Sequence, residues 1–274
     1  MRIALCNKTL EHLPLEAFFD LAAGAGYDAV ELGPQTLGTS VTSPDPAARA
    51  GVRRAAQRRG LAIVGFNSIF QDTQDLALVT RDAAVRRRST AMLSGLAQLV
   101  GEWGARVIVV GSPRQRQAPP DATSEEAIRL FLDELLPACD VAAEHGVTFC
   151  LEPLEARLTN FMNDTAEGIA IIERAQHPAL RLLLDVKQMA TEGPSMPDLI
   201  RQGAPWLRHF HLNDANRHAP GEGATDFVPI LRALLETSYT GAASVEAFAF
   251  NGPPDDVLRR SRAYLAACLE GAAS

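Results

Sequence analysis

The stretch that decides the fold is Gly146-Val147-Thr148-Phe149-Cys150-Leu151-Glu152, which contains a helix end, a buried strand and a polar strand end in succession. The helical pattern of residues 124–145 stops at Gly146, and glycine suits the left-handed conformation found at helix C-termini. The apolar run that follows is typical of a strand buried on both faces. The same order of helix, glycine and strand recurs at Gly26 and Gly60. The chain therefore repeats a unit of helix and strand.

Short apolar runs alternate with amphipathic helical patterns along the whole chain. The expected strands are Ile3–Cys6, Ala29–Leu32, Ala62–Phe66, Val107–Val110, Thr148–Glu152, Leu182–Asp185, His209–Leu212 and Ser244–Glu246. The expected helices are Pro14–Ala25, Pro46–Arg59, Ala83–Trp103, Ser124–His145, Thr165–Ala175, Met196–Gln202, Phe227–Glu236 and Asp255–Leu269. This alternation predicts a parallel sheet covered by helices, and eight strands are the number that closes a barrel. We therefore expect an α/β fold, a single (β/α)8 TIM barrel domain over residues 1–274.

An open, doubly wound sheet is the structural alternative. Such a sheet usually carries a glycine-rich phosphate-binding loop after its first strand. The turn after Cys6 reads Asn7-Lys8-Thr9-Leu10 and contains no glycine. This turn argues for the barrel.

Composition and charge exclude several classes of protein. The chain has 26 Lys and Arg against 33 Asp and Glu, a formal net charge of -7, which argues against a nucleic-acid binder with a basic surface. Its four cysteines show neither CxxC spacing nor a dense disulfide pattern, so a reducing compartment is expected. We expect no signal peptide and find no apolar run of about 18 residues. The chain is interpreted as a cytoplasmic protein that binds neither nucleic acid nor membrane.

Active sites of such barrels lie at the carboxyl ends of the strands. Four successive expected strands carry metal-binding side chains there: Glu152, Asp185, His211 and Glu246. Each alone would fit a helix cap or a buried histidine, but a carboxylate that ends a buried strand must be paired or bound to a cation. Three carboxylates and one imidazole favour Mn²⁺ in octahedral geometry, with Mg²⁺, Co²⁺ or Zn²⁺ as alternatives. We predict one divalent metal ion at this position.

Other strand ends give weaker indications. The third strand ends at Phe66 or Asn67, and we expect both residues to contact the substrate. Glu31 ends the second strand. His209 lies one pleat from His211 on the same side of its strand, and both a supporting role for His211 and a place in the core fit this position.

Several short sequence motifs around these residues match those of a known family. They are Leu151-Glu152-Pro153-Leu154, Leu184-Asp185 with Met189, His209-Phe210-His211, Asn216-Arg217 with Pro220-Gly221-Glu222-Gly223, and Val245-Glu246-Ala247-Phe248. The chain thus resembles the xylose isomerase-like TIM barrel superfamily of sugar phosphate isomerases and epimerases, and within it the ketose 3-epimerases of the tagatose and psicose type.

The resemblance implies that Glu152, Asp185, His211 and Glu246 are the metal ligands and that Glu152 and Glu246 form the acid–base pair. It also implies that Arg217 contacts the substrate and that Phe248 is a pocket aromatic. A homodimer or homotetramer is expected on the same ground.

Two positions depart from the family pattern. Gln188 stands where these epimerases usually have a histidine, and Leu158 stands where they tend to have a second glutamate. Gln188 is still expected to bind a substrate hydroxyl, although it cannot carry a positive charge. Lys187 beside it is interpreted as solvated, with a positive charge at the site as the alternative. Both departures leave the metal ligands intact and argue against a simple free ketohexose as the substrate.

Two loops are expected near the barrel mouth. Pro113–Thr123 is interpreted as a surface loop that can close over a ligand or contact another subunit. The loop that contains Asn213–His218, Gly221 and Gly223 can approach a ligand closely. Phosphate binding by this loop is disfavoured because Arg217 is its only convincing cation.

The predicted activity is a metal-dependent isomerase or epimerase acting on a ketose or related keto sugar. One glutamate would remove the proton beside a metal-bound carbonyl and the other would return it, through an enediolate. Elimination from the same enediolate is the first alternative, which gives a lyase or dehydratase on a 3-keto-glycoside or dehydroshikimate-like substrate. A non-catalytic metal- or sugar-binding protein is the second. An endonuclease for abasic DNA would need more metal-binding histidines than the six present supply, and a basic groove.

Overall fold

The computed structural model describes residues 1–37, 45–71 and 73–274. Within these residues, eight parallel strands pair in chain order and close into a barrel. The strands are β1 (Arg2–Cys6), β2 (Ala29–Leu32), β3 (Ala62–Phe66), β4 (Val107–Val110), β5 (Thr148–Leu151), β6 (Leu180–Asp185), β7 (Leu207–Leu212) and β8 (Ala242–Val245). The first strand pairs with both the second and the last, which closes the sheet. The predicted (β/α)8 barrel is confirmed.

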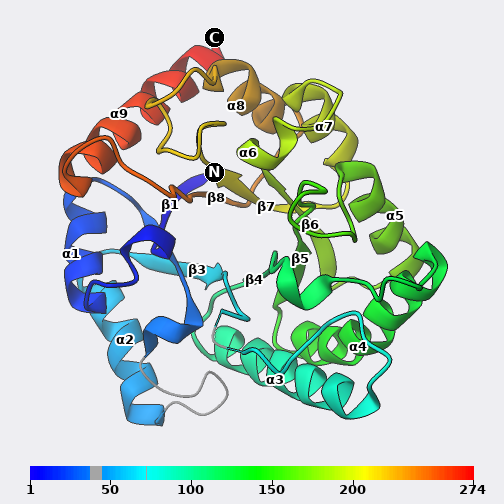
Figure 1. Ribbon diagram of the computed structural model, residues 1–274. Helices are drawn as coiled ribbons and strands as arrows, with labels where there is room; N and C mark the ends of the chain where they lie inside the picture. The colour runs from blue at the N-terminus through cyan, green and yellow to red at the C-terminus, as the bar shows by residue number, and fades with distance from the viewer. Residues whose placement is uncertain (38–44, 72) are drawn as a thin grey trace.

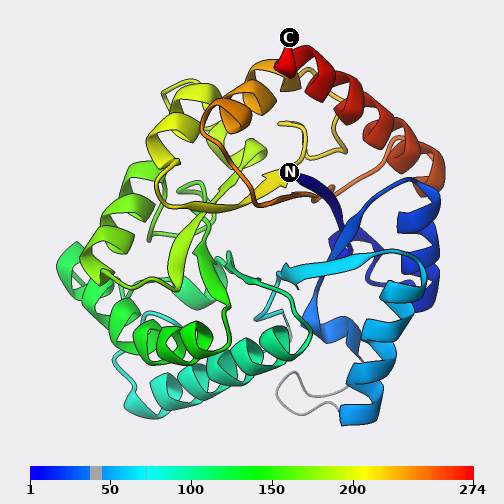
Figure 2. The same ribbon diagram turned by 180° about the vertical axis from the view of Figure 1, so that it is seen from behind.

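Helices form a ring around the strands (Figure 1). They are α1 (Leu15–Gly24), α2 (Pro46–Arg58), α3 (Ala83–Glu102), α4 (Ser124–Glu144), α5 (Thr165–Ala175), α7 (Met196–Gly203), α8 (Phe227–Glu236) and α9 (Pro254–Ala273). Figure 2 shows the same ring from behind. A short additional helix, α6 (Val186–Met189), lies inside this ring (Figure 1). Among the described residues, no helix is long and apolar enough to cross a membrane.

Side-chain caps and glycines set the ends of these helices. Asp82, Thr123 and Asp164 accept hydrogen bonds from backbone N–H groups in the first turns of α3, α4 and α5. Gly26 and Gly146 follow helix ends with φ angles of 84° and 64°, which residues with a Cβ disfavour. The chain enters β2 and β5 directly after these glycines, so the helix ends determine where the two strands begin.

Along each strand, side chains alternate between the barrel interior and the layer of helices. The interior contains a small apolar cluster formed by Val107, Val109, Cys150 and Leu183. The neighbouring side chains, such as Ile108, belong to the larger core between strands and helices. Glu152 and Asp185 follow Cys150 and Leu183 by two residues, so the same alternation directs both carboxylates inward at the carboxyl ends of their strands.

Two strands end one residue earlier than expected. β5 ends at Leu151 and β8 at Val245, whereas the sequence predicted Glu152 and Glu246 as their last residues. The backbone N–H of Glu152 still donates to Val110 O at 3.3 Å, and that of Glu246 to Leu212 O at 3.0 Å. Both glutamates therefore keep the position of strand residues, while their carboxylates lie just beyond the strands at the barrel mouth.

A test of the barrel packing uses Gly65 in β3. A Cβ at this position would overlap the carbonyl oxygen of Val107 in β4. We expect Gly65→Ala to lower the free energy of unfolding by about 1–3 kcal/mol, because the overlap involves backbone atoms that cannot move aside. The matched control is Gly51→Ala in α2, where a Cβ has open space and where alanine should stabilise the helix by about 0.5–1 kcal/mol. Chemical denaturation of both variants checks the prediction, and equal midpoints would contradict it.

Candidate metal centre and active site

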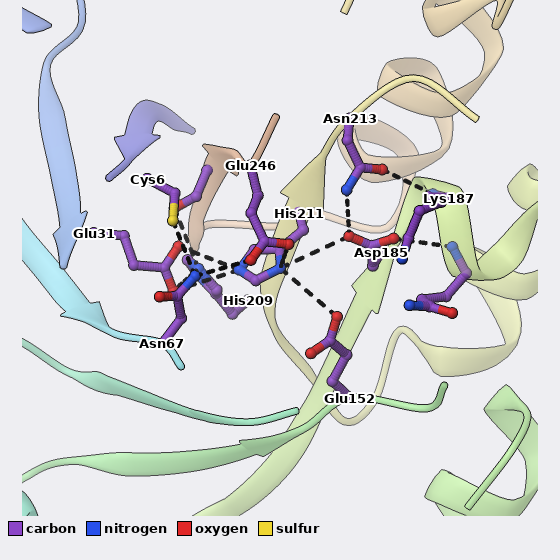
Figure 3. A network of polar contacts seen from close by, with 12 residues as sticks. Cys6, Glu31, Asn67, Glu152, Asp185, Lys187, His209, His211, Asn213 and Glu246 are labelled. Carbon is purple, nitrogen blue, oxygen red and sulfur yellow. Dashed lines mark hydrogen bonds and ion pairs between the residues drawn. The ribbon is translucent and has the colours of Figure 1, made fainter. Parts of the chain in front are cut away.

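The four predicted ligands converge at the barrel mouth (Figure 3). Glu152, Asp185, His211 and Glu246 each place one ligand atom within 4.8 Å of the others, and all four residues are buried. The central atom of this group is Nδ1 of His211. It lies 3.3 Å from Glu246 Oε2, 3.8 Å from Asp185 Oδ2 and 3.9 Å from Glu152 Oε1. One imidazole nitrogen therefore faces three carboxylates.

Neighbouring polar side chains hold two of the carboxylates in place. Asp185 Oδ2 accepts a hydrogen bond from Asn213 Nδ2 at 2.6 Å, and its Oδ1 caps α6 through the N–H of Gln188 at 2.9 Å. Glu246 Oε1 accepts from Asn67 Nδ2 at 3.0 Å. Such contacts fix the orientation of a carboxylate before it binds a cation.

The other nitrogen of His211 faces away from the carboxylate cluster. Its Nε2 lies 3.2 Å from Oε2 of Glu31, a side chain that is fully buried on β2. Glu31 Oε1 also lies 3.3 Å from Nε2 of His209 (Figure 3). When Nε2 of His211 carries the ring proton and donates a hydrogen bond to Glu31, the lone pair of Nδ1 is free to bind a cation. Glu31 and His209 thus support His211 from inside the barrel.

A fully buried arginine lies behind Glu152. Arg116 Nη1 donates to the backbone oxygen of Glu152 at 2.6 Å, and the side chain has no exposed surface. The sequence prediction that Pro113–Thr123 is a surface loop is therefore wrong at Gln115 and Arg116, which are both buried. The loop turns inward at the 3-10 helix Arg114–Arg116, because the carbonyl groups at the end of the barrel accept hydrogen bonds from the guanidinium.

Burial and mutual repulsion change the protonation of this cluster. Burial, together with repulsion from Glu246 and Asp185, raises the pKa of Glu152 to about 8 against the opposing effect of His211. Burial, followed by repulsion from Glu246, also raises the pKa of Asp185. Burial lowers the pKa of His211, but Glu31 and Glu246 outweigh it and leave that pKa well above its usual value. Burial raises the pKa of Glu31, yet His209 and His211 hold it well below its usual range.

These residues fit a divalent cation. Nδ1 of His211 is buried and makes no hydrogen bond of normal geometry with the described residues. A Cβ on Gly111 would overlap Oε2 of Glu152, so a glycine there leaves room for the carboxylate beside β4. Three carboxylate oxygens and one imidazole nitrogen suit Mn²⁺, Mg²⁺ or Co²⁺ better than the sulfur- and nitrogen-preferring Zn²⁺. A cation would also remove the repulsion among the carboxylates.

A cavity of about 230 Å³ opens onto this cluster. Glu152, His211 and Glu246 line it, together with four residues predicted to contact the substrate: Asn67, Gln188, Arg217 and Phe248. The remaining predicted contact, Phe66, is not part of the cavity wall. Its ring is fully buried against Trp103, with centroids 5.5 Å apart. Strand alternation explains the difference, because Phe66 faces the helices when Asn67 faces the interior.

The two departures from the family pattern both line this cavity. Leu158 and Leu154 give it an apolar wall after β5. Gln188 Oε1 accepts a hydrogen bond from the N–H of Glu155 at 3.1 Å, which directs the carbonyl end of the amide toward the protein. Its NH₂ group makes no hydrogen bond with the described residues and is available as a donor.

Three residues of the site carried no assigned role in the sequence analysis. Asn213 lies in a loop and Arg116 in a 3-10 helix of three residues, and neither segment is long enough for a periodicity to indicate burial. Glu31 had a recognisable signal, since it is a carboxylate in the apolar strand Ala29-Val30-Glu31-Leu32. Its partners could not be identified because they lie on β7, which is far away in the sequence.

Comparison with known proteins places the fold in context. The family model described as "Xylose isomerase-like TIM barrel" matches residues 19–268. D-psicose 3-epimerase of Agrobacterium fabrum is 26% identical over 239 residues, which cover 86% of this chain and 80% of that protein. L-ribulose 3-epimerase of Methylomonas sp. is 26% identical over 83% of this chain and 76% of its own length. A crystal structure of D-psicose 3-epimerase, determined with D-fructose, superposes with a TM-score of 0.85 at 21% identity and covers 98% of this chain and 99% of that one.

The metal site can be tested by titrating metal-free protein with Mn²⁺. We expect one ion per chain and a dissociation constant that falls at least tenfold between pH 6 and pH 8. Protons on His211 and Glu152 compete with the cation, and the pKa values of both groups are raised, so affinity grows as the pH rises. Saturation at 100 times the dissociation constant should add about 2.7 kcal/mol to the free energy of unfolding. Calorimetry on wild type and on His211→Ala is the measurement, and equal affinities in the two would exclude this site.

Proposed function

The chain belongs to the xylose isomerase-like TIM barrel family, and from that premise we propose that it is a metal-dependent sugar epimerase acting on a ketose or related keto sugar. The observation that carries the proposal is the pair Glu152 and Glu246. Both side chains line the cavity and both belong to the ligand cluster. The proposed cofactor is one divalent ion, with Mn²⁺ favoured by the ligand set.

Each part of the site has a role in this reaction. A divalent ion held by the four ligands would polarise the substrate carbonyl and stabilise the negative charge that develops when the adjacent carbon loses its proton. Glu152 and Glu246 approach the cluster from different sides of His211 in Figure 3. One of them removes the proton and the other returns a proton to the opposite face of the carbon, which inverts its configuration.

The polar side chains of the cavity wall position the substrate. The NH₂ group of Gln188 donates to a substrate oxygen, and the guanidinium of Arg217 donates to another. Phe248 covers the sugar from the side of β8 and excludes water from the reacting carbon. Asn67 keeps the Glu246 carboxylate in one orientation through its hydrogen bond.

Elimination is the second candidate outcome, and Leu158 is the observation that favours it. Its apolar side chain stands in the cavity wall, where no carboxylate holds the far end of the substrate. A β-oxygen substituent lost from the enediolate would make the protein a lyase on a 3-keto-glycoside or dehydroshikimate-like compound. NMR in D₂O separates the outcomes, because epimerisation gives a deuterated diastereomer and elimination gives an unsaturated product.

The acid–base assignment is tested with Glu246→Gln. We expect the variant to fold and to lose proton exchange at the substrate carbon by about 10²–10⁴-fold, since glutamine cannot accept a proton. Deuterium incorporation followed by NMR measures the rate, with Mn²⁺ affinity determined in parallel to separate proton transfer from metal loss. Glu236→Gln, an exposed glutamate on α8, is the matched control and should keep the wild-type rate. Exchange by Glu246→Gln at the wild-type rate would show that another group transfers the proton.

A further inference from the structure

Two cations share one aromatic ring at the wall of the cavity. Lys187 Nζ lies 4.9 Å from the centroid of the Phe248 ring, and Arg217 Cζ lies 5.1 Å from the same centroid. All three residues line the cavity. The two charges are therefore at most about 10 Å apart, close to one Debye length at physiological salt.

Neither cation has an anionic partner in the described part of the chain, where neither side chain makes an ion pair or donates a hydrogen bond. Lys8, a third cation of the cavity wall, differs in this respect. Its Nζ donates to Gln71 Oε1 at 2.6 Å and lies 3.4 Å from Glu11 Oε1. The charge of Lys8 is thus already compensated, whereas those of Lys187 and Arg217 face the cavity and the ring alone.

Lys187 favours the charged form of Asp185 at longer range and so lowers its pKa, but the two side chains form no ion pair. A divalent ion held by the four ligands would offset two of the three carboxylate charges, and the buried guanidinium of Arg116 lowers the pKa of the Glu152 carboxyl. The carboxylate of Glu31 lies against two imidazoles, with Nε2 of His209 at 3.3 Å and Nε2 of His211 at 3.2 Å. Lys187 and Arg217 thus line the cavity without an ion-pair partner among the described residues.

The backbone holds both cations in place. Arg217 has a positive φ of 76°, an unfavourable conformation for a residue with a side chain. Its N–H donates to Asp214 O at 2.8 Å, and its carbonyl accepts from the N–H of Phe248 at 2.9 Å, so the arginine and the ring are fixed together. The N–H of Lys187 donates to Asn213 Oδ1 at 2.8 Å, and the same asparagine holds the ligand Asp185. The position of Lys187 is therefore coupled to the metal centre.

We propose that the substrate is an acidic keto sugar, whose carboxylate or phosphate group is bound between Lys187 and Arg217 beside Phe248. This inference rests on the proposed function and specifies its substrate class. Arg217 is the only convincing cation of its own loop, but α6 brings Lys187 to the same ring, in agreement with the alternative that Lys187 places a positive charge at the site. An anionic group would interact favourably with both cations, and Leu154 and Leu158 would contact the less polar part of the molecule.

The test compares substrates that share one carbon skeleton. D-Fructose is the neutral member, D-fructuronate carries a carboxylate at C6, 2-keto-D-gluconate carries one at C1, and D-fructose 6-phosphate carries a phosphate. For each compound, kcat/KM is measured as the rate of C3 hydrogen exchange in D₂O with Mn²⁺-loaded protein. We expect at least one acidic compound to exceed D-fructose by tenfold or more, with a preference that declines as salt is added. The preferred compound distinguishes carboxylate from phosphate and C1 from C6.

Variants locate the binding group. Lys187→Met should reduce the ratio of kcat/KM for the preferred acid to that for D-fructose by about tenfold or more. Lys8→Met is the matched control from the same cavity, and it should change this ratio far less because its charge is already compensated. A wild-type preference for D-fructose over every acid would overturn the inference, and so would an unchanged ratio in Lys187→Met.

A binding measurement separates this inference from the proposed function. If no compound exchanges its C3 hydrogen, the proposed epimerase activity fails, but the anion site can still be examined. Calorimetry with gluconate and the neutral polyol sorbitol, on Mn²⁺-loaded protein, should then show gluconate binding at least tenfold more tightly, and this advantage should be lost in Lys187→Met. Equal affinities for gluconate and sorbitol would overturn the inference on their own.

Discussion

Three carboxylates buried around one imidazole nitrogen are the constraint on which the rest of this structure depends. Removing a charge from water costs several kcal/mol unless a partner of opposite charge is close. Neighbouring polar groups offset part of this cost: Asn213 donates a hydrogen bond to Asp185, Asn67 donates one to Glu246, and the charge of Arg116 lowers the pKa of the Glu152 carboxyl. These contacts reduce the cost but do not remove the repulsion, as the raised pKa of Glu152 shows. A divalent cation held by the four proposed ligands would complete the balance.

The barrel provides this arrangement through the two-residue period of its strands. Because alternate side chains face inward, His209 and His211 both lie in the interior and meet Glu31 across the barrel. Ser244 on the adjacent strand lies 3.3 Å from His209 Nε2 and extends this polar layer. The layer lies directly behind the metal ligands and determines which nitrogen of His211 faces them. A substitution at Glu31 would therefore act on the metal centre without touching the cavity.

The sequence predicted the barrel and the convergence of its four strand-end residues because both follow from local periodicity. Alternation of strands and helices is visible in short windows, and parallel strands in a barrel bring their carboxyl ends to one mouth. Contacts that depend on the register between distant strands were not predictable, such as that between Glu31 and His211. The prediction that Phe66 contacts the substrate was wrong by one residue, because its side chain faces the helices whereas that of Asn67 faces the barrel interior. Arg116 was misplaced because a proline-rich loop with several polar residues has the composition of an exposed segment.

The unusual residues of the cavity form one consistent pattern. The cavity wall after β5 carries the apolar Leu158, and the cations Lys187 and Arg217 lie on the wall formed by α6 and the loop after β7. A glutamate at position 158 would add an anion to the same cavity and repel an acidic substrate, so a leucine there suits the ligand that Lys187 and Arg217 would bind. Gln188 fits this pattern too, since its free NH₂ group can donate to an oxygen without adding a third positive charge. In the proposed reaction the metal centre would supply the chemistry, and the charges on one side of the cavity would select the molecule on which it acts.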